Sequence, residues 1–93
     1  MPEAHTDIEA RVRAAFADEL CCPPALVRPD SPLTELPGLD SLKLLRVIAA
    51  LETTLDVGLD DELFYSLRTV GDVTTLITDE LLALAALTGR RRP

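Results

Sequence analysis

The chain has 93 residues, of which 47% are apolar and 27% are charged, and its 16 acidic and 9 basic residues give a formal net charge of −7 at pH 7. A chain of this length forms one small core and is too short for a second domain or an enclosed active site. The acidic balance argues against nucleic acid as a partner, because binding to a polyphosphate depends on clustered lysine and arginine.

An apolar stripe at four-residue steps predicts the first helix. Thr6 or Asp7 can serve as its N-cap, and Pro23-Pro24 ends it because neither ring can donate a helical hydrogen bond. The stripe consists of Ile8, Val12, Phe16 and Leu20. Cys21 and Cys22 are adjacent, which excludes an ordinary disulfide framework and the CxxC metal spacing, so we expect two partly buried thiols at the helix end.

The segment from Pro23 to Asp40 is predicted to be a long connection without regular helix. It contains prolines at positions 23, 24, 29, 32 and 37. A long loop in a small domain is usually functional or disordered, but this one also carries apolar residues that can pin it across the bundle. These anchors are Leu26, Val27, Leu33, Leu36 and Leu39.

Helical periodicity resumes at Asp40-Ser41 and predicts a second helix over about 41–55. Its expected apolar stripe is Leu42, Leu45, Ile48, Ala49, Leu51 and Leu55. Gly58 marks a break, and residues 60–67 suffice for a short third helix with acids at its dipole-favoured start. Thr69 and Asp72 resemble a capping box that opens a last helix over about 70–87, with Gly89 as its C-terminal cap residue.

The segment from Leu36 to Leu42 stands at the junction of the long connection and the second helix. Gly38 permits a backbone turn that other residues avoid, and Asp40 and Ser41 lie at the helix N-terminus, with Leu39 and Leu42 able to pack inward. One interpretation is a simple helix cap. The other is a phosphate ester on the Ser41 hydroxyl, because the free amides and the dipole of a helix N-terminus favour an anion.

Residues 38–42, Gly-Leu-Asp-Ser-Leu, resemble the attachment motif of the acyl carrier protein family. Around the motif, Ala49–Glu52, Leu59, Asp61-Glu62 and Thr69-Val70 stand where this family has matching residues, so the resemblance covers roughly residues 8–84. It implies an all-α four-helix bundle of acyl-carrier type, with three long helices, a short third helix and a long first loop. We expect the carrier domain to span residues 1–88 and a disordered basic tail to follow at 89–93.

The resemblance implies a substrate shuttle and not an enzyme. A phosphopantetheinyl transferase would use the Ser41 hydroxyl to attack the pyrophosphate of coenzyme A with help from Mg²⁺, which leaves 4′-phosphopantetheine on the serine. In the family, Asp40 helps to dock the transferase and its metal, Leu42 packs beneath the serine, and Gly38 belongs to the motif. The thiol of the arm then holds an acyl group as a thioester.

The family alignment also suggests partner and cargo residues. Lys43 and Arg46 stand where fatty-acid carriers have acids, which favours a dedicated polyketide or hybrid secondary-metabolite pathway, and these two residues with Leu39 are expected to contact partner enzymes. We expect the partners to be the transferase, an acyl-loading acyltransferase or ligase, and a ketosynthase or tailoring enzymes. The acyl pocket would be lined by Leu45, Ala49, Leu51, Leu59, Phe64, Leu67 and Val73, with the Phe64 ring filling space that a long chain would need.

Other functions agree less well with the sequence. A peptidyl or aminoacyl carrier of a nonribosomal pathway is the alternative within the family, and a helical interaction domain without a prosthetic group is the alternative outside it. An esterase that uses Ser41 lacks a placed base, and His5, the only histidine, precedes the first predicted turns. The acidic N-terminus is unlike a signal peptide and no apolar run is long enough for a bilayer, so we expect a cytoplasmic monomer that binds no metal and no membrane.

Overall fold

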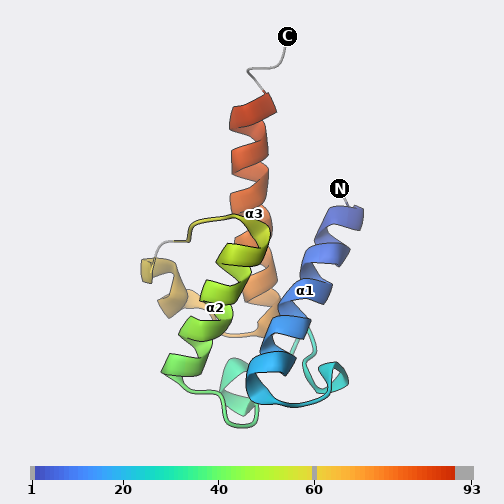
Figure 1. Ribbon diagram of the computed structural model, residues 1–93, viewed down its shortest axis with the longest axis vertical. Helices are drawn as coiled ribbons and strands as arrows, with labels where there is room; N and C mark the ends of the chain where they lie inside the picture. The colour runs from blue at the N-terminus through green and yellow to red at the C-terminus, as the bar shows by residue number, and fades with distance from the viewer. Residues whose placement is uncertain (1, 60, 90–93) are drawn as a thin grey trace.

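Three α-helices form the body of the molecule, and the long connection between the first two lies at one end of them (Figure 1). The computed structural model describes residues 2–59 and 61–89. In chain order the elements are α1 (Pro2–Leu20), η1 (Pro24–Leu26), η2 (Leu33–Glu35), α2 (Ser41–Leu55), η3 (Asp61–Ser66) and α3 (Val70–Gly89). The all-α prediction is confirmed. The short third helix is η3, a 3₁₀ turn and not an α-helix, in keeping with the use of 3₁₀ geometry in short pieces.

Helix α1 packs against both α2 and α3. Its buried side chains are Ile8, Val12, Phe16 and Ala17, which confirms the predicted stripe, while Leu20 at its end is half-buried. The predicted N-caps Thr6 and Asp7 are wrong, because the helix begins at Pro2 and both residues lie inside it. Asp7 instead pairs with Arg11 one turn later, at 3.1 Å between Oδ2 and Nε.

Helix α1 ends at a left-handed residue. Cys21 has φ of +54°, and the N–H of Cys22 donates to the carbonyl of Ala17 at 3.1 Å, which closes the last turn before the two prolines. Cys21 is exposed and Cys22 is half-buried. The expectation of two partly buried thiols is therefore correct only for Cys22.

Backbone hydrogen bonds hold the long connection against the start of α3. The N–H of Leu33 donates to the carbonyl of Arg68 at 2.8 Å, that of Val70 to Ser31 at 3.1 Å, and that of Gly71 to Pro29 at 2.7 Å. The predicted anchors Val27, Leu33 and Leu36 are buried and Leu39 is half-buried, but Leu26 is exposed. The connection is thus held across the bundle, as expected. Its apolar side chains pack in the core, and its backbone forms hydrogen bonds with the start of α3.

Helix α2 has the predicted bounds, but it buries a different face. Val47, Ile48 and Leu51 are buried, and Leu44 and Leu55 are half-buried against the same core. Leu42, Leu45 and Ala49, which were expected in the core stripe, are exposed. The helix is apolar at so many positions that periodicity alone does not select its inner face.

Helix α3 begins with the predicted capping box. The Asp72 carboxylate accepts from the N–H groups of Arg68 (2.9 Å) and Thr69 (3.1 Å), and the Thr69 hydroxyl accepts from the N–H of Asp72 at 3.2 Å. These hydrogen bonds hold the pKa of the Asp72 carboxyl below its usual value, the bond from Arg68 contributing most. The helix extends to Gly89, and the rest of the predicted tail, residues 90–93, lies outside the described residues.

No helix in residues 2–59 and 61–89 is both long and apolar enough to cross a bilayer.

Candidate functional site

A left-handed turn at Gly38 brings the chain to the start of α2. Gly38 has φ of +76°, a conformation that L residues rarely adopt, and the N–H of Leu39 donates to the carbonyl of Leu36 at 3.2 Å. Leu39 is half-buried and packs against the core. A Cβ at Gly38 would lie 3.5 Å from Nζ of Lys43, so the ammonium group of Lys43 lies beside this turn.

Asp40 caps α2, and this leaves the Ser41 hydroxyl available for another role. Asp40 has an extended backbone, and its Oδ1 accepts from the N–H of Lys43 at 2.8 Å. Ser41 is the first helical residue and is exposed. Its hydroxyl therefore stands at a helix N-terminus, where free amides and the helix dipole favour an anionic group such as a phosphate.

Leu42 lies on the outside of the molecule and not beneath the serine. Its side chain is 59% exposed, which corrects the expectation that Leu42 packs inward. The reason is the inner face of α2 described above: Val47, Ile48 and Leu51 are turned to the core, which leaves Leu42 on the opposite side of the helix.

A hollow of about 360 Å³ opens directly beside Ser41. It lies between the start of α2 and η3, and it is lined by Ser41, Leu44, Leu45, Phe64 and Tyr65. Leu45 and Phe64 were predicted as cargo-lining residues, whereas Leu44 and Tyr65 were missed. Phe64 is half-buried and forms part of the wall of the hollow, and its blocking of a long chain stays a prediction.

The other predicted pocket residues do not border this hollow. Leu51, Leu59 and Val73 are buried in the core, Leu67 is half-buried against it, and Ala49 is exposed. The family alignment thus groups residues that the fold separates into a packed interior and an open hollow. The interior is filled by its own side chains, because the core residues leave little of their surface accessible.

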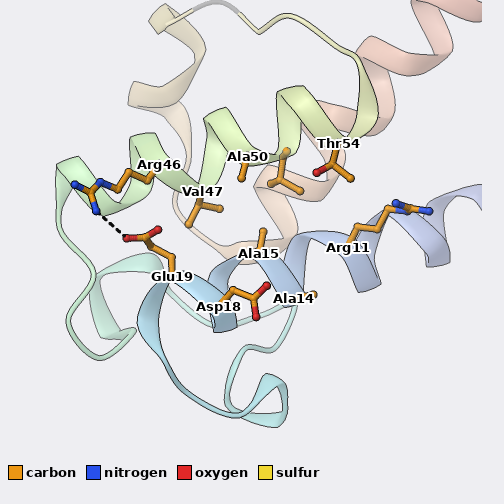
Figure 2. Close-up of a pocket in the computed structure, with 10 residues that line it drawn as sticks. Arg11, Ala14, Ala15, Asp18, Glu19, Arg46, Val47, Ala50 and Thr54 are labelled. Carbon is orange, nitrogen blue, oxygen red and sulfur yellow. Dashed lines mark ion pairs between the residues drawn. The ribbon is translucent and has the colours of Figure 1, made fainter.

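Arg46 lies on the side of α2 that borders α1 and forms an ion pair with that helix. Its Nη1 is 3.7 Å from Oε2 of Glu19, and its side chain is 63% exposed (Figure 2). A second hollow, of about 410 Å³, lies between α1 and α2, where Figure 2 shows Ala15 and Val47 among its lining residues. This larger hollow does not include Ser41, and its charged lining residues are of both signs, Arg11 and Arg46 against Asp18 and Glu19.

Within the described ranges, no group of three or more His, Cys, Asp or Glu side chains is placed to hold a metal ion.

Comparison with known proteins identifies the class of this site. A family model described as the phosphopantetheine attachment site matches residues 10–77, which is well over half of the chain. The chain belongs to the acyl carrier protein family. It is 35% identical over 78 residues to an acyl carrier protein of Thermosynechococcus vestitus, covering 84% of this chain and 96% of that protein. It is 28% identical over 87 residues to an acyl carrier protein of Saccharopolyspora erythraea, covering 94% of this chain and 92% of that one.

Membership of the acyl carrier protein family establishes the general function of the protein. It is a carrier and not an enzyme, and it bears a covalently attached 4′-phosphopantetheine group. The residues at the start of α2 fit such a group, since the exposed Ser41 hydroxyl can form a phosphate ester and the N–H groups of the first helical turn face the same end. When bound, the group supplies a thiol that forms thioesters. As a family member, the carrier interacts with a phosphopantetheinyl transferase and with enzymes that handle acyl groups.

Proposed function

We propose that Ser41 is the attachment residue of the phosphopantetheine arm. The observation that carries this proposal is the division of roles at the start of α2, where Asp40 provides the N-cap and Ser41 is left exposed. The chain has two other serines, and both use their hydroxyls locally. The Ser31 hydroxyl accepts from the N–H of Arg28 at 3.0 Å, and the Ser66 hydroxyl donates to the carbonyl of Leu63 at 2.8 Å.

The attachment reaction requires an accessible hydroxyl on the carrier. The transferase supplies the base and Mg²⁺, Oγ of Ser41 forms a bond to the phosphorus that bears the pantetheine arm, and the nucleotide half of coenzyme A leaves. Asp40 contributes by fixing the first turn of α2, and Gly38 contributes by allowing the chain to turn immediately before it. The N-terminal dipole of α2 then stabilises the phosphodiester.

We further propose that the carrier serves polyketide or hybrid secondary-metabolite biosynthesis in the cytoplasm. This rests on Lys43 and Arg46, which stand on α2 where carriers of fatty-acid synthesis have acids. An acyltransferase or ligase would load the thiol, and a ketosynthase or a tailoring enzyme would consume the thioester. Intact mass of the protein isolated from its host, with cargo attached, identifies the acyl group; a series of saturated fatty acyl chains would overturn the proposed pathway.

The attachment proposal is tested with coenzyme A, Mg²⁺ and a broad-specificity phosphopantetheinyl transferase. We expect the intact mass of the wild type to increase by one phosphopantetheine, and that of Ser41→Ala to stay unchanged. Ser66→Ala is the matched control, because it removes an exposed serine hydroxyl on η3 and should be modified like the wild type. Modification of Ser41→Ala, or no modification of the wild type beside a carrier that is modified, contradicts the proposal.

A further inference from the structure

The outer side of α2 carries exposed leucines next to Ser41. Leu42 is 59% exposed and Leu45 is 49% exposed, and across the hollow Tyr65 is 92% exposed. Large apolar side chains at this exposure, gathered around one functional residue, are typical of a surface that another protein covers. We call the set Leu42, Lys43, Leu45, Arg46 and Tyr65 the docking face.

The charges of α2 on this face are positive, although the chain as a whole is acidic. The charged residues of α2 are Lys43, Arg46 and Glu52. The Glu52 carboxylate is turned to the loop after α2, where it accepts from the N–H of Leu59 at 2.9 Å. Among the acids near the face, Asp40 is used in the N-cap and Glu19 of α1 lies beside Arg46, while Glu62 is exposed on η3.

Arg46 is available to a partner. Its guanidinium lies 3.7 Å from the Glu19 carboxylate, which is longer than a hydrogen bond, and Arg46 is 63% exposed (Figure 2). An exposed pair of this length contributes little to stability. A carboxylate on another protein can therefore approach Arg46 without breaking a strong internal contact.

We propose that the enzymes that serve this carrier present an apolar depression rimmed by carboxylates, into which Leu42, Leu45 and Tyr65 fit while Lys43 and Arg46 face the acidic rim. The inference rests on the proposed attachment at Ser41, because an enzyme that acts on the arm must then approach this end of α2. Rim charges mainly raise the association rate and select among partners, whereas buried leucines slow dissociation. The combination gives a carrier that enzymes with basic docking patches accept poorly.

The test uses a malonyl-coenzyme A acyltransferase of fatty-acid synthesis whose carrier-docking patch is basic, and a variant of it in which those lysines and arginines are changed to glutamate. Malonyl transfer to the phosphopantetheine form of the carrier gives kcat/KM for each pair. We expect the wild type to prefer the acidic variant by about three- to tenfold at low salt. Lys43→Glu with Arg46→Glu should reverse the preference, and added salt should reduce it.

Arg28→Glu is the matched control for charge. Arg28 is 68% exposed and pairs with Asp30 at 3.6 Å, much as Arg46 pairs with Glu19, but it lies in the long connection.

The apolar side chains of the docking face are tested separately. Leu42→Asn should raise KM severalfold with the acidic variant of the acyltransferase, whereas Leu82→Asn, at a position 54% exposed on α3, should not. Equal kcat/KM for both acyltransferases, or equal effects of the target and control substitutions, overturns the inference.

Intact mass separates this outcome from failure of the proposed function. Complete modification of the wild type at Ser41 without any charge preference rejects the docking face and leaves the attachment proposal standing. A preference for the acidic acyltransferase on protein modified at another residue rejects the attachment at Ser41 and with it the reason for docking at this end of α2.

Discussion

The side-chain carboxylate of Glu52 accepts a hydrogen bond from the backbone N–H of Leu59, with 2.9 Å between the two atoms. The backbone carbonyl of Glu52 also accepts from the N–H of Val57 at 3.0 Å, which closes the end of α2 around the left-handed residue Asp56. One residue thus holds both the turn after α2 and the chain that leads to η3. The fixed chain leads toward η3, whose residues Phe64 and Tyr65 form a wall of the hollow beside Ser41.

Glu52→Ala should loosen the loop after α2. The Leu59 N–H would lose its partner in a partly buried position, and we expect the free energy of unfolding to fall by about 1–2 kcal/mol. Glu52→Gln keeps a carbonyl acceptor and should cost less. Urea denaturation measures both, and amide exchange at Leu59 should accelerate in Glu52→Ala. Glu35→Ala, at an exposed acid of η2, is the control, and an equal loss in both alanine variants would contradict the role of Glu52.

Asp72 should make stability depend on pH in the acid range. Hydrogen bonds from the N–H groups of Arg68 and Thr69 lower the pKa of its carboxyl below the usual 3.8. The ionised form is therefore favoured in the folded state, so its contribution is complete above the unfolded pKa and is lost as pH falls through the lowered folded pKa. Asp72→Asn should cost about 0.5–2 kcal/mol at neutral pH and flatten the acid limb of the stability curve. Asp79→Asn, which removes an exposed acid from the same helix, is the control for the loss of one negative charge, and an equal change in both variants would contradict the role of Asp72.

Gly71 is required by a close backbone contact. A Cβ at this position would lie 2.8 Å from the carbonyl oxygen of Pro29, which accepts the Gly71 N–H at 2.7 Å. Gly71→Ala should therefore displace the long connection and lower stability by about 1–3 kcal/mol, despite the better helix propensity of alanine. A Cβ at Gly58 meets nothing within 4 Å, so thermal denaturation of Gly58→Ala should differ little from the wild type. If Gly71→Ala is as stable as the wild type, the long connection can shift at little cost, and glycine is not required at this position.

Cys21→Gly should stabilise the protein. Cys21 is exposed with φ of +54°, a region that costs an L residue about 1 kcal/mol and costs glycine nothing sterically. We expect a gain of about 0.5–1 kcal/mol in urea denaturation. Cys22→Gly is the neighbouring control, and it should be destabilising because Cys22 packs against the core. A loss of stability in Cys21→Gly would mean that its thiol has a structural role.

These left-handed positions also show where the sequence stops predicting the structure. The bounds of α2 follow from the cap at Asp40 and the turn at Gly38, which are visible in the residue types. Cys21 carries no such signal, because left-handed helix ends are usually glycine. Aspartate adopts this conformation only occasionally, so Asp56 is a weaker signal than the nearby Gly58.

The inner face of α2 shows a second limit of sequence reasoning. Leucine occurs at positions 42, 44, 45, 51 and 55 of this helix, so several faces satisfy a helical period equally well. Contact with α1 selects Val47 and Ile48 for the core, and this selection is a property of the whole bundle. The hollow beside Ser41 was therefore assigned to the right two elements but in part to the wrong side chains, with Leu44 and Tyr65 missed.

How far an acyl chain enters the carrier depends on the packing around the hollow beside Ser41. The hollow begins at Ser41 itself and is bounded by Leu44, Leu45, Phe64 and Tyr65, and the interior residues Leu51 and Val73 are at most 2% exposed. Opening that interior to an alkyl chain would require the core to part, which dense packing resists.

We therefore expect octanoyl cargo to remain at the rim of the hollow. Compared with acetyl cargo, it should shift the NMR resonances of Leu44, Leu45 and Tyr65 and leave those of Leu51, Leu59 and Val73 in place. Phe64→Ala removes half of the aromatic wall and should let octanoyl-specific shifts extend inward, at a stability cost below the about 3–5 kcal/mol of a fully buried ring, because Phe64 is half-buried. Tyr65→Ala is the matched control, since Tyr65 is 92% exposed and its loss opens no path to the core. Large octanoyl-specific shifts at Leu51 and Val73 in the wild type would show that the core does part and that the carrier sequesters its cargo.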